Sequence, residues 1–303
     1  MLLAASCDPV PDEKTNSDPS PTACATTPPI DQPAAHETKA VHVLVDRSPS
    51  YSHLTDASLE LLAEFVPEAA LPGDRFVFGW ISDNPNLPIE TFFNEEVPFV
   101  TPPELGEFPA PTPVDCGPLT TVQCERARQL ELTELPLAIC DLEKQKSEAR
   151  TELEDWQREQ TTLLDSFRES ARSAANGQNP EHPEGTLVTE ALYRAARALE
   201  GFLDGGHQSA RLVIFSDLEE ARPATSPQGP LLLQLDGVDV IVAMFNCSRT
   251  WDVLTGIATE PQVCERHRTR WEPIFMSASA ASVRFLTLEA STVSTLAGLV
   301  NED

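Results

Sequence analysis

The chain has 303 residues, enough for one domain of ordinary size with additional segments. It carries 21 basic and 48 acidic residues, a formal net charge of -27, so we expect no nucleic-acid partner, because phosphate binding needs clustered Lys and Arg. The 27 prolines exceed the usage of one compact domain and predict extended segments. No apolar run reaches the roughly 20 residues of a membrane span.

The amino terminus, MLLAASC, is a short apolar run followed by small residues and a cysteine. Residues 1–7 resemble the lipobox of bacterial lipoproteins, which implies that Cys7 would carry a lipid anchor. A basic segment is absent and the apolar run is shorter than that of a signal peptide. Either the true start lies upstream, or the resemblance is coincidental.

Residues 8–38 are rich in Pro, Ser, Thr, Asp and Ala and show no periodicity. This composition predicts a disordered tether, because it lacks the apolar residues that a packed core requires. We therefore expect the folded domain to span residues 39–303.

The first strong element is an apolar, β-branched run at residues 41–45, which predicts a buried strand. Asp46, Ser48 and Ser50 follow it on the loop at its carboxyl end. Ligands of open α/β sheets bind at such strand ends. One carboxylate and two hydroxyls are hard oxygen ligands, which suit a hard cation such as Mg²⁺ or Ca²⁺.

Strands and helices alternate along the rest of the domain. Helices are predicted at 54–66, 187–202 and 264–280 with a short one in the tail 287–303, and strands at 75–81, 210–215, 238–245 and 283–286, with a weaker edge strand at 90–93. This alternation predicts an α/β fold with a mostly parallel sheet and helices on both faces.

An insertion at residues 95–182 interrupts this alternation. It contains a Pro-rich loop at 98–118, a short helix at 122–135 that stops before Pro136, and a long helix at about 141–175 without Pro or Gly. An apolar stripe runs along the long helix, made of Leu142, Ala149, Leu153, Trp156, Leu163, Phe167, Ala171 and Ala174. Either this helix is an arm that packs its stripe on the parent domain, or it binds a partner or forms a coiled-coil dimer. Lys146 and Gln160 interrupt the stripe and weaken the coiled-coil interpretation.

Two further polar residues lie at the ends of predicted elements, one before a helix and one after a strand. Thr186 follows Gly185 at the start of the helix 187–202, and Asp217 directly follows the strand 210–215. Parallel strands bring their carboxyl ends to one edge, so Thr186 and Asp217 are predicted to join Asp46, Ser48 and Ser50. Two carboxylates and three hydroxyls form a mostly neutral shell for Mg²⁺, with Ca²⁺ or Mn²⁺ as alternatives. The cation would then accept an acidic ligand from another molecule.

The order Asp-x-Ser-x-Ser at 46–50, Gly185-Thr186, and Phe215-Ser216-Asp217 resembles the von Willebrand factor type A (VWA) domain and its metal-ion-dependent adhesion site. The resemblance implies a Rossmann-like three-layer sandwich and metal-mediated binding of an Asp or Glu of a protein partner. The family usually has Gly after the last aspartate, where this chain has Leu218. The insertion has no counterpart in the family core.

We therefore expect a non-enzymatic binding module, exported and tethered to the cell envelope, with membrane contact only through Cys7; a cytoplasmic location is the alternative. A second hypothesis is a structural scaffold that acts through the insertion, with a degenerate metal site or a metal that only staples the fold. A Mg²⁺-dependent hydrolase is a third, disfavoured because Ser48 stands where a second acid is expected and no phosphate-binding P-loop is present.

The chain has seven cysteines, none in a CxxC pair, so a structural zinc site is not expected. If Cys7 is lipidated, six remain, an even set that fits an oxidising compartment. We expect Cys247 to pair with Cys264, and Cys116 to pair with Cys124 or Cys140, which leaves Cys24 for the remaining one. Fully reduced thiols in the cytosol are the alternative.

Overall fold

The computed structural model describes residues 30–31, 36–48, 50–81, 90–109, 117, 121–178, 187–219, 233–243, 260–287 and 289–302. The chain divides into two compact units. One comprises residues 1–33 and 102–155, and the other comprises residues 34–101 and 156–303. The tether and the lipobox-like segment lie almost entirely outside the described residues, so both stay predictions.

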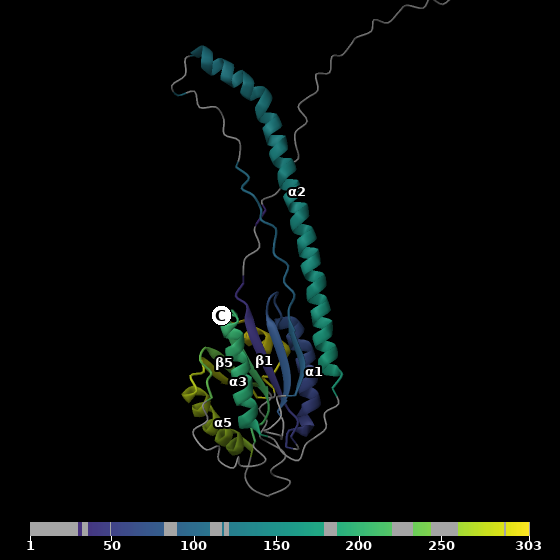
Figure 1. Cartoon of the computed structure of the whole chain (residues 1–303), viewed down its shortest axis with the longest axis vertical. Helices are drawn as coiled ribbons and strands as arrows, with labels where there is room; N and C mark the ends of the chain where they lie inside the picture. The colour runs from purple at the N-terminus through teal and green to yellow at the C-terminus, as the bar shows by residue number, and fades with distance from the viewer. Residues whose placement is uncertain are drawn as a thin grey trace, which may run out of the picture. The chain divides into compact units, whose positions relative to one another are not determined.

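The second unit contains a six-stranded sheet in the order β3-β2-β1-β4-β5-β6. Figure 1 labels two of these strands, β1 and β5. Every neighbouring pair is parallel except β2 and β3, which are antiparallel. The strands are β1 (Lys39–Asp46), β2 (Arg75–Ile81), β3 (Thr91–Glu96), β4 (Ser209–Phe215), β5 (Val238–Ala243) and β6 (Ser282–Phe285). The predicted α/β class with a mostly parallel sheet is confirmed, and the weak strand β3 lies at a sheet edge as expected.

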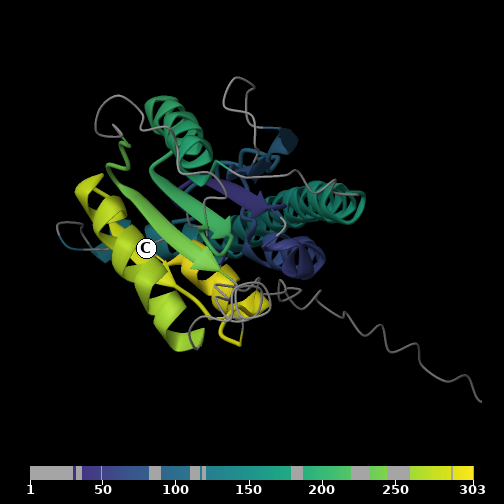
Figure 2. The same cartoon turned by 90° about the horizontal axis from the view of Figure 1, so that it is seen from below.

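Alternate residues of the strands belong to two separate apolar clusters, as the period of two in a strand requires. Val41, Val43 and Val45 of β1 pack in one cluster with α1 (Ser52–Ala69) and α6 (Val293–Asn301). Ala40 and Leu44 pack in the other with α3 (Val188–Asp204) and α5 (Glu260–Ser277). Figure 2 shows α3 and α5 along one side of the strands. All eight residues of β1 are buried, so this strand is central to the unit.

The insertion contains one continuous helix, α2 (Thr121–Asn176), of 56 residues. Two helices separated at Pro136 were predicted, and that break is absent. Residues with good helix propensity flank Pro136 on both sides, so the helix continues despite the hydrogen bond that a proline removes. Pro67 likewise lies inside the last turn of α1 and does not end that helix where the sequence predicts.

Among the described side chains of α2, those that are buried lie in its carboxyl-terminal part. Phe167, Ala171 and Ala175 belong to the same cluster as α1, so the packing-arm interpretation holds for this part. Gln160, predicted to interrupt the stripe, is buried there: its amide accepts from the Val100 N–H at 2.8 Å and donates to the Pro98 carbonyl at 2.7 Å.

The part of α2 in the first unit is different, because no described side chain between residues 121 and 155 is buried. Val122, Leu130 and Leu137 are more than half exposed. Cys124 and Cys140 both form disulfides. The other five cysteine side chains lie outside the described residues, so the predicted pairings stay predictions. Among the described residues, no helix combines the length and the apolar character that crossing a membrane requires.

Candidate metal centre

The carboxyl ends of β1 and β4 meet at one edge of the sheet. Val45 of β1 pairs with Phe215 of β4, so the residues that follow, Asp46 and Ser216, lie side by side at this edge. The strand order also reverses at this point, since β2 lies on one side of β1 and β4 on the other. Such a position is where open α/β sheets bind ligands.

Asp46 is completely buried, and both oxygens of its carboxylate accept hydrogen bonds. The Ser48 backbone N–H donates to Oδ1 at 2.7 Å, and the Ser216 hydroxyl donates to Oδ2 at 2.6 Å. The Thr55 hydroxyl fixes the backbone of the same residue, because it donates to the Asp46 carbonyl at 3.0 Å. The Ser48 hydroxyl also forms a hydrogen bond with this carboxylate. The two oxygens offer about four lone-pair positions, so this arrangement orients the group and leaves it able to bind a cation.

Hydroxyl contacts connect Asp46 to Asp217. The hydroxyls of Ser48 and Ser50 lie 3.0 Å apart, and the Ser50 hydroxyl donates to the Asp217 carboxylate. The Ser48 hydroxyl also accepts the Tyr51 N–H at 3.3 Å, which holds the loop against the start of α1. Four of the five predicted ligands therefore form one connected group.

The fifth predicted ligand, Thr186, lies outside the described residues. The described chain resumes at Leu187, and α3 begins at Val188. The place of Thr186 in the shell stays a prediction.

Two contributors to this edge were not identified from the sequence. Ser216 bridges the two loops, since its hydroxyl donates to Asp46 and accepts the Leu218 N–H at 2.8 Å. Trp271 of α5 donates from Nε1 to the Leu218 carbonyl at 3.0 Å. Trp271 lies in the segment 264–280 that the sequence predicts to be helical, but no local pattern links it to a residue 53 positions earlier.

Burial opposes the ionisation of both acids, and Asp46 further opposes that of Asp217. Burial raises the pKa of Asp46, and burial followed by repulsion from Asp46 raises the pKa of Asp217 to about 8. Among the described residues, no Lys or Arg forms an ion pair with either carboxylate. Two buried like charges surrounded by hydroxyls fit a divalent cation, which would offset the repulsion.

Other metal chemistries have less support. Within the described parts of the chain, no three His, Cys, Asp or Glu side chains form a group that could hold a metal ion. The candidate site therefore depends on hydroxyl oxygens as well as its two carboxylates, as hard cations allow. His42 lies inside β1, fully buried, and neither ring nitrogen has a hydrogen-bond partner.

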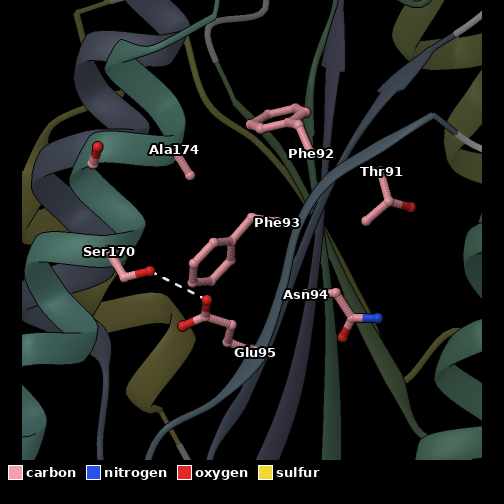
Figure 3. Close-up of a pocket in the computed structure, with 8 residues that line it drawn as sticks. Thr91, Phe92, Phe93, Asn94, Glu95, Ser170 and Ala174 are labelled. Carbon is pink, nitrogen blue, oxygen red and sulfur yellow. Dashed lines mark hydrogen bonds between the residues drawn. The ribbon is translucent and has the colours of Figure 1, made fainter.

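A shallow cavity of about 680 Å³ lies elsewhere in the second unit, between the edge strand β3 and the carboxyl-terminal part of α2 (Figure 3). Phe93 packs at its base, and the Ser170 hydroxyl donates to Glu95 at 3.2 Å across it. Its lining contains one carboxylate and no His, Cys, Lys or Arg, so it offers neither a metal ligand set nor an acid–base pair.

No protein-family model and no curated protein matches the chain. Among solved structures, it is similar to proximal thread matrix protein 1 (PTMP1) from the mussel byssus, with 11% sequence identity and a TM-score of 0.37. The similarity covers 87% of this chain and 46% of the byssus protein's chain, so this chain spans less than half of that protein's length. A similarity at this level carries no argument about function.

Proposed function

We propose that the chain is a VWA-type binding module that holds Mg²⁺, or alternatively Ca²⁺ or Mn²⁺, and grips an acidic side chain of a protein partner through it. The proposed ligands are Asp46, Ser48, Ser50, Thr186 and Asp217. Mg²⁺ requires six oxygen ligands, so five from this chain leave one position for a partner's Asp or Glu.

The connected group formed by Asp46, Ser48, Ser50 and Asp217 carries this proposal. Residues up to 171 positions apart in sequence meet there, and the two carboxylates are buried without a basic partner among the described residues. Neither helix capping nor loop solvation explains why two acids lie close together in a buried place.

The fold supports the same proposal. The strand order 3-2-1-4-5-6 occurs in doubly wound α/β proteins, and the two apolar clusters draw on helices from different sides of the sheet. We propose that these elements form a Rossmann-like three-layer sandwich with α2 as an insertion. The lipobox-like residues 1–7 support an exported protein anchored at Cys7 to the cell envelope, with a cytoplasmic location as the alternative.

Titration of Mg²⁺ into the EDTA-stripped full chain, followed by partner capture, tests the proposal. We expect Mg²⁺ to bind one site, and Asp46→Asn to abolish that binding. Asp56→Asn changes an exposed acid of α1 and serves as the matched control. Partner capture should need Mg²⁺ and return when Mg²⁺ is restored. If EDTA leaves the partner affinity unchanged, the proposal is wrong.

A structural scaffold is the second candidate. The first part of α2 favours it, because that helix buries no described side chain in its own unit and exposes Val122, Leu130 and Leu137. In this case a metal ion would stabilise the fold without contacting a partner. Asp46→Ala separates the candidates. A purely structural metal ion predicts a large loss of thermal stability, whereas a partner-binding metal ion predicts lost partner binding with a modest change in stability.

A further inference from the structure

We propose that Trp271 is a positioning residue of the metal centre, which holds Leu218 in a left-handed backbone conformation so that Asp217 stays directed toward Asp46. This inference rests on the proposed function for the identity of the ligand. It assigns a role to α5, an element that supplies no proposed ligand.

Leu218 adopts a conformation that a leucine disfavours. Its φ is 57°, in the left-handed region where Cβ crowds the following carbonyl. Glycine occupies this region freely, but a residue with a side chain needs other contacts to hold it there. The structure supplies such contacts to both polar backbone atoms of Leu218.

The N–H of Leu218 donates to the Ser216 hydroxyl at 2.8 Å, and its carbonyl accepts from Trp271 Nε1 at 3.0 Å. Both contacts are buried, and the Leu218 side chain is completely inaccessible. The indole of Trp271 is itself fixed, because it is 2% exposed and stacks on Phe275 with ring centroids 5.9 Å apart. A buried carbonyl that lost this donor would have no water to replace it.

Asp217 lies between Ser216 and Leu218, and buried hydrogen bonds hold both of these residues. Rotation of Leu218 into an ordinary helical or extended conformation would turn the peptide planes on either side and re-aim the Asp217 carboxylate. The contact between the Asp217 carboxylate and the Glu219 N–H, 3.0 Å, depends on the same turn. Trp271 therefore acts on the site through Leu218 and not by touching the cation.

Hydrogen exchange of the metal-free full chain, combined with Mg²⁺ titration, tests this role. Trp271→Phe keeps an aromatic ring against Phe275 and removes the indole N–H. We expect amide exchange at residues 217–219 to accelerate about tenfold and Mg²⁺ affinity to fall about tenfold, the effect of one lost buried hydrogen bond. Amides in the middle of β4 should keep their exchange rates.

Two further variants separate positioning from general core packing. Trp156→Phe removes an indole N–H that donates to the Val100 carbonyl at 2.8 Å, and it should change neither readout. In a Leu218→Gly background the left-handed turn no longer needs to be held, so adding Trp271→Phe should reduce Mg²⁺ affinity less than threefold. An equal loss in both backgrounds would overturn the inference, as would unchanged exchange at 217–219.

The two proposals fail in different ways. If the wild-type chain binds no Mg²⁺ at Asp46, the proposed function is wrong, but exchange at 217–219 still decides whether Trp271 holds the loop. If Trp271→Phe does not fold, the wild-type indole N–H resonances provide the measurement. Mg²⁺ should shift the Trp271 indole resonance and leave that of Trp156 unchanged, and no shift at Trp271 contradicts the inference.

Discussion

The Ser216 hydroxyl donates a 2.6 Å hydrogen bond to the buried carboxylate of Asp46, across 170 positions of sequence. The same oxygen accepts the N–H of Leu218, so one small side chain connects the loop after β1 to the loop after β4. This connection fixes the relative position of the two carboxylates before any cation binds. Preorganisation of this kind lowers the free energy that ligand binding must supply.

Ser216→Ala should therefore weaken both folding and cation binding. It leaves an Asp46 oxygen and the Leu218 N–H without a partner in a buried place, which we expect to lower the free energy of unfolding by about 1–3 kcal/mol. Urea unfolding in EDTA measures this loss, and Mg²⁺ titration measures the affinity.

Ser282→Ala is the matched control for Ser216→Ala. Its hydroxyl donates to Asp239 near the amino ends of β5 and β6, at the opposite edge of the sheet from the site. It should reduce stability without reducing Mg²⁺ affinity. Equal affinity losses in the two variants would show that Ser216 has no special role at the site.

Asp217→Asn should separate folding stability from cation binding. The substitution replaces a carboxyl whose ionisation is opposed by burial and by Asp46 with a neutral amide, so we expect the free energy of unfolding in EDTA to be unchanged or higher than in the wild type. A cation at one hundred times its Kd stabilises the wild type by about 2.7 kcal/mol, and this increment should disappear in the variant. Thermal unfolding with EDTA and with Mg²⁺ measures both effects. The exposed Asp204→Asn should retain the increment, and an Asp217→Asn protein that keeps it would contradict the assigned ligand.

The strands and the edge at which the acids meet are predictable because they depend on local patterns. The buried run at 41–45 and the polar residues that end it place Asp46 at a strand end, and the same logic places Asp217. Parallel pairing then brings the two ends together. Four of the five proposed ligand residues, Asp46, Ser48, Ser50 and Asp217, lie together as this reasoning predicts, and their role as metal ligands stays a prediction.

The remaining features depend on tertiary contacts that no local pattern encodes. Trp271 approaches Leu218 only after α5 packs on the sheet, and Leu218 takes a glycine-like conformation because those contacts hold it. The predicted helix boundary at Pro136 is wrong for a related reason. The prediction considered the hydrogen bond that a proline removes and not the helix propensity of the residues on either side.

The two parts of α2 should differ in their effect on stability. Leu137 is 67% exposed, so Leu137→Ser should change the free energy of unfolding of the sheet-containing unit by less than about 0.5 kcal/mol. Phe167 is 2% exposed and contacts the rings of Phe76 and Phe93, so Phe167→Ala should lower it by about 3–5 kcal/mol. Urea unfolding followed by far-ultraviolet circular dichroism measures both. A large loss in Leu137→Ser would show that the first part of the helix supports the fold.

His42 should make the protein sensitive to acid. Burial lowers the pKa of His42 to about 4, below the value of about 6.5 in an unfolded chain. The unfolded state therefore binds more protons than the folded state between these values. Stability that depends on His42 is complete above about pH 6.5 and decreases as the pH falls toward 4, by about 3 kcal/mol.

His42→Val should remove this pH dependence, and the exposed His53→Ala should retain it. The raised pKa values of Asp46 and Asp217 act with the opposite sign, because they let the folded state bind protons more readily. The comparison is therefore the difference between wild type and His42→Val in EDTA, measured by urea unfolding from pH 7 to pH 4. A difference that does not change with pH would contradict the assignment.

Lys39 and Asp74 form a buried ion pair at the amino end of the sheet, and breaking it should be costly. The two groups lie 3.0 Å apart with side chains 6% and 0% exposed, and Lys39 Nζ also donates to Asn301 of α6 at 2.6 Å. Lys39→Met leaves the Asp74 charge buried, so we expect a loss of about 3–5 kcal/mol in the free energy of unfolding. Lys144→Met breaks an exposed pair with Glu148 and should cost at most about 1 kcal/mol. Adding Asp74→Asn to Lys39→Met should recover part of the stability in urea unfolding, because the unpaired charge is removed; no recovery would show that the loss arises from packing and not from the charge.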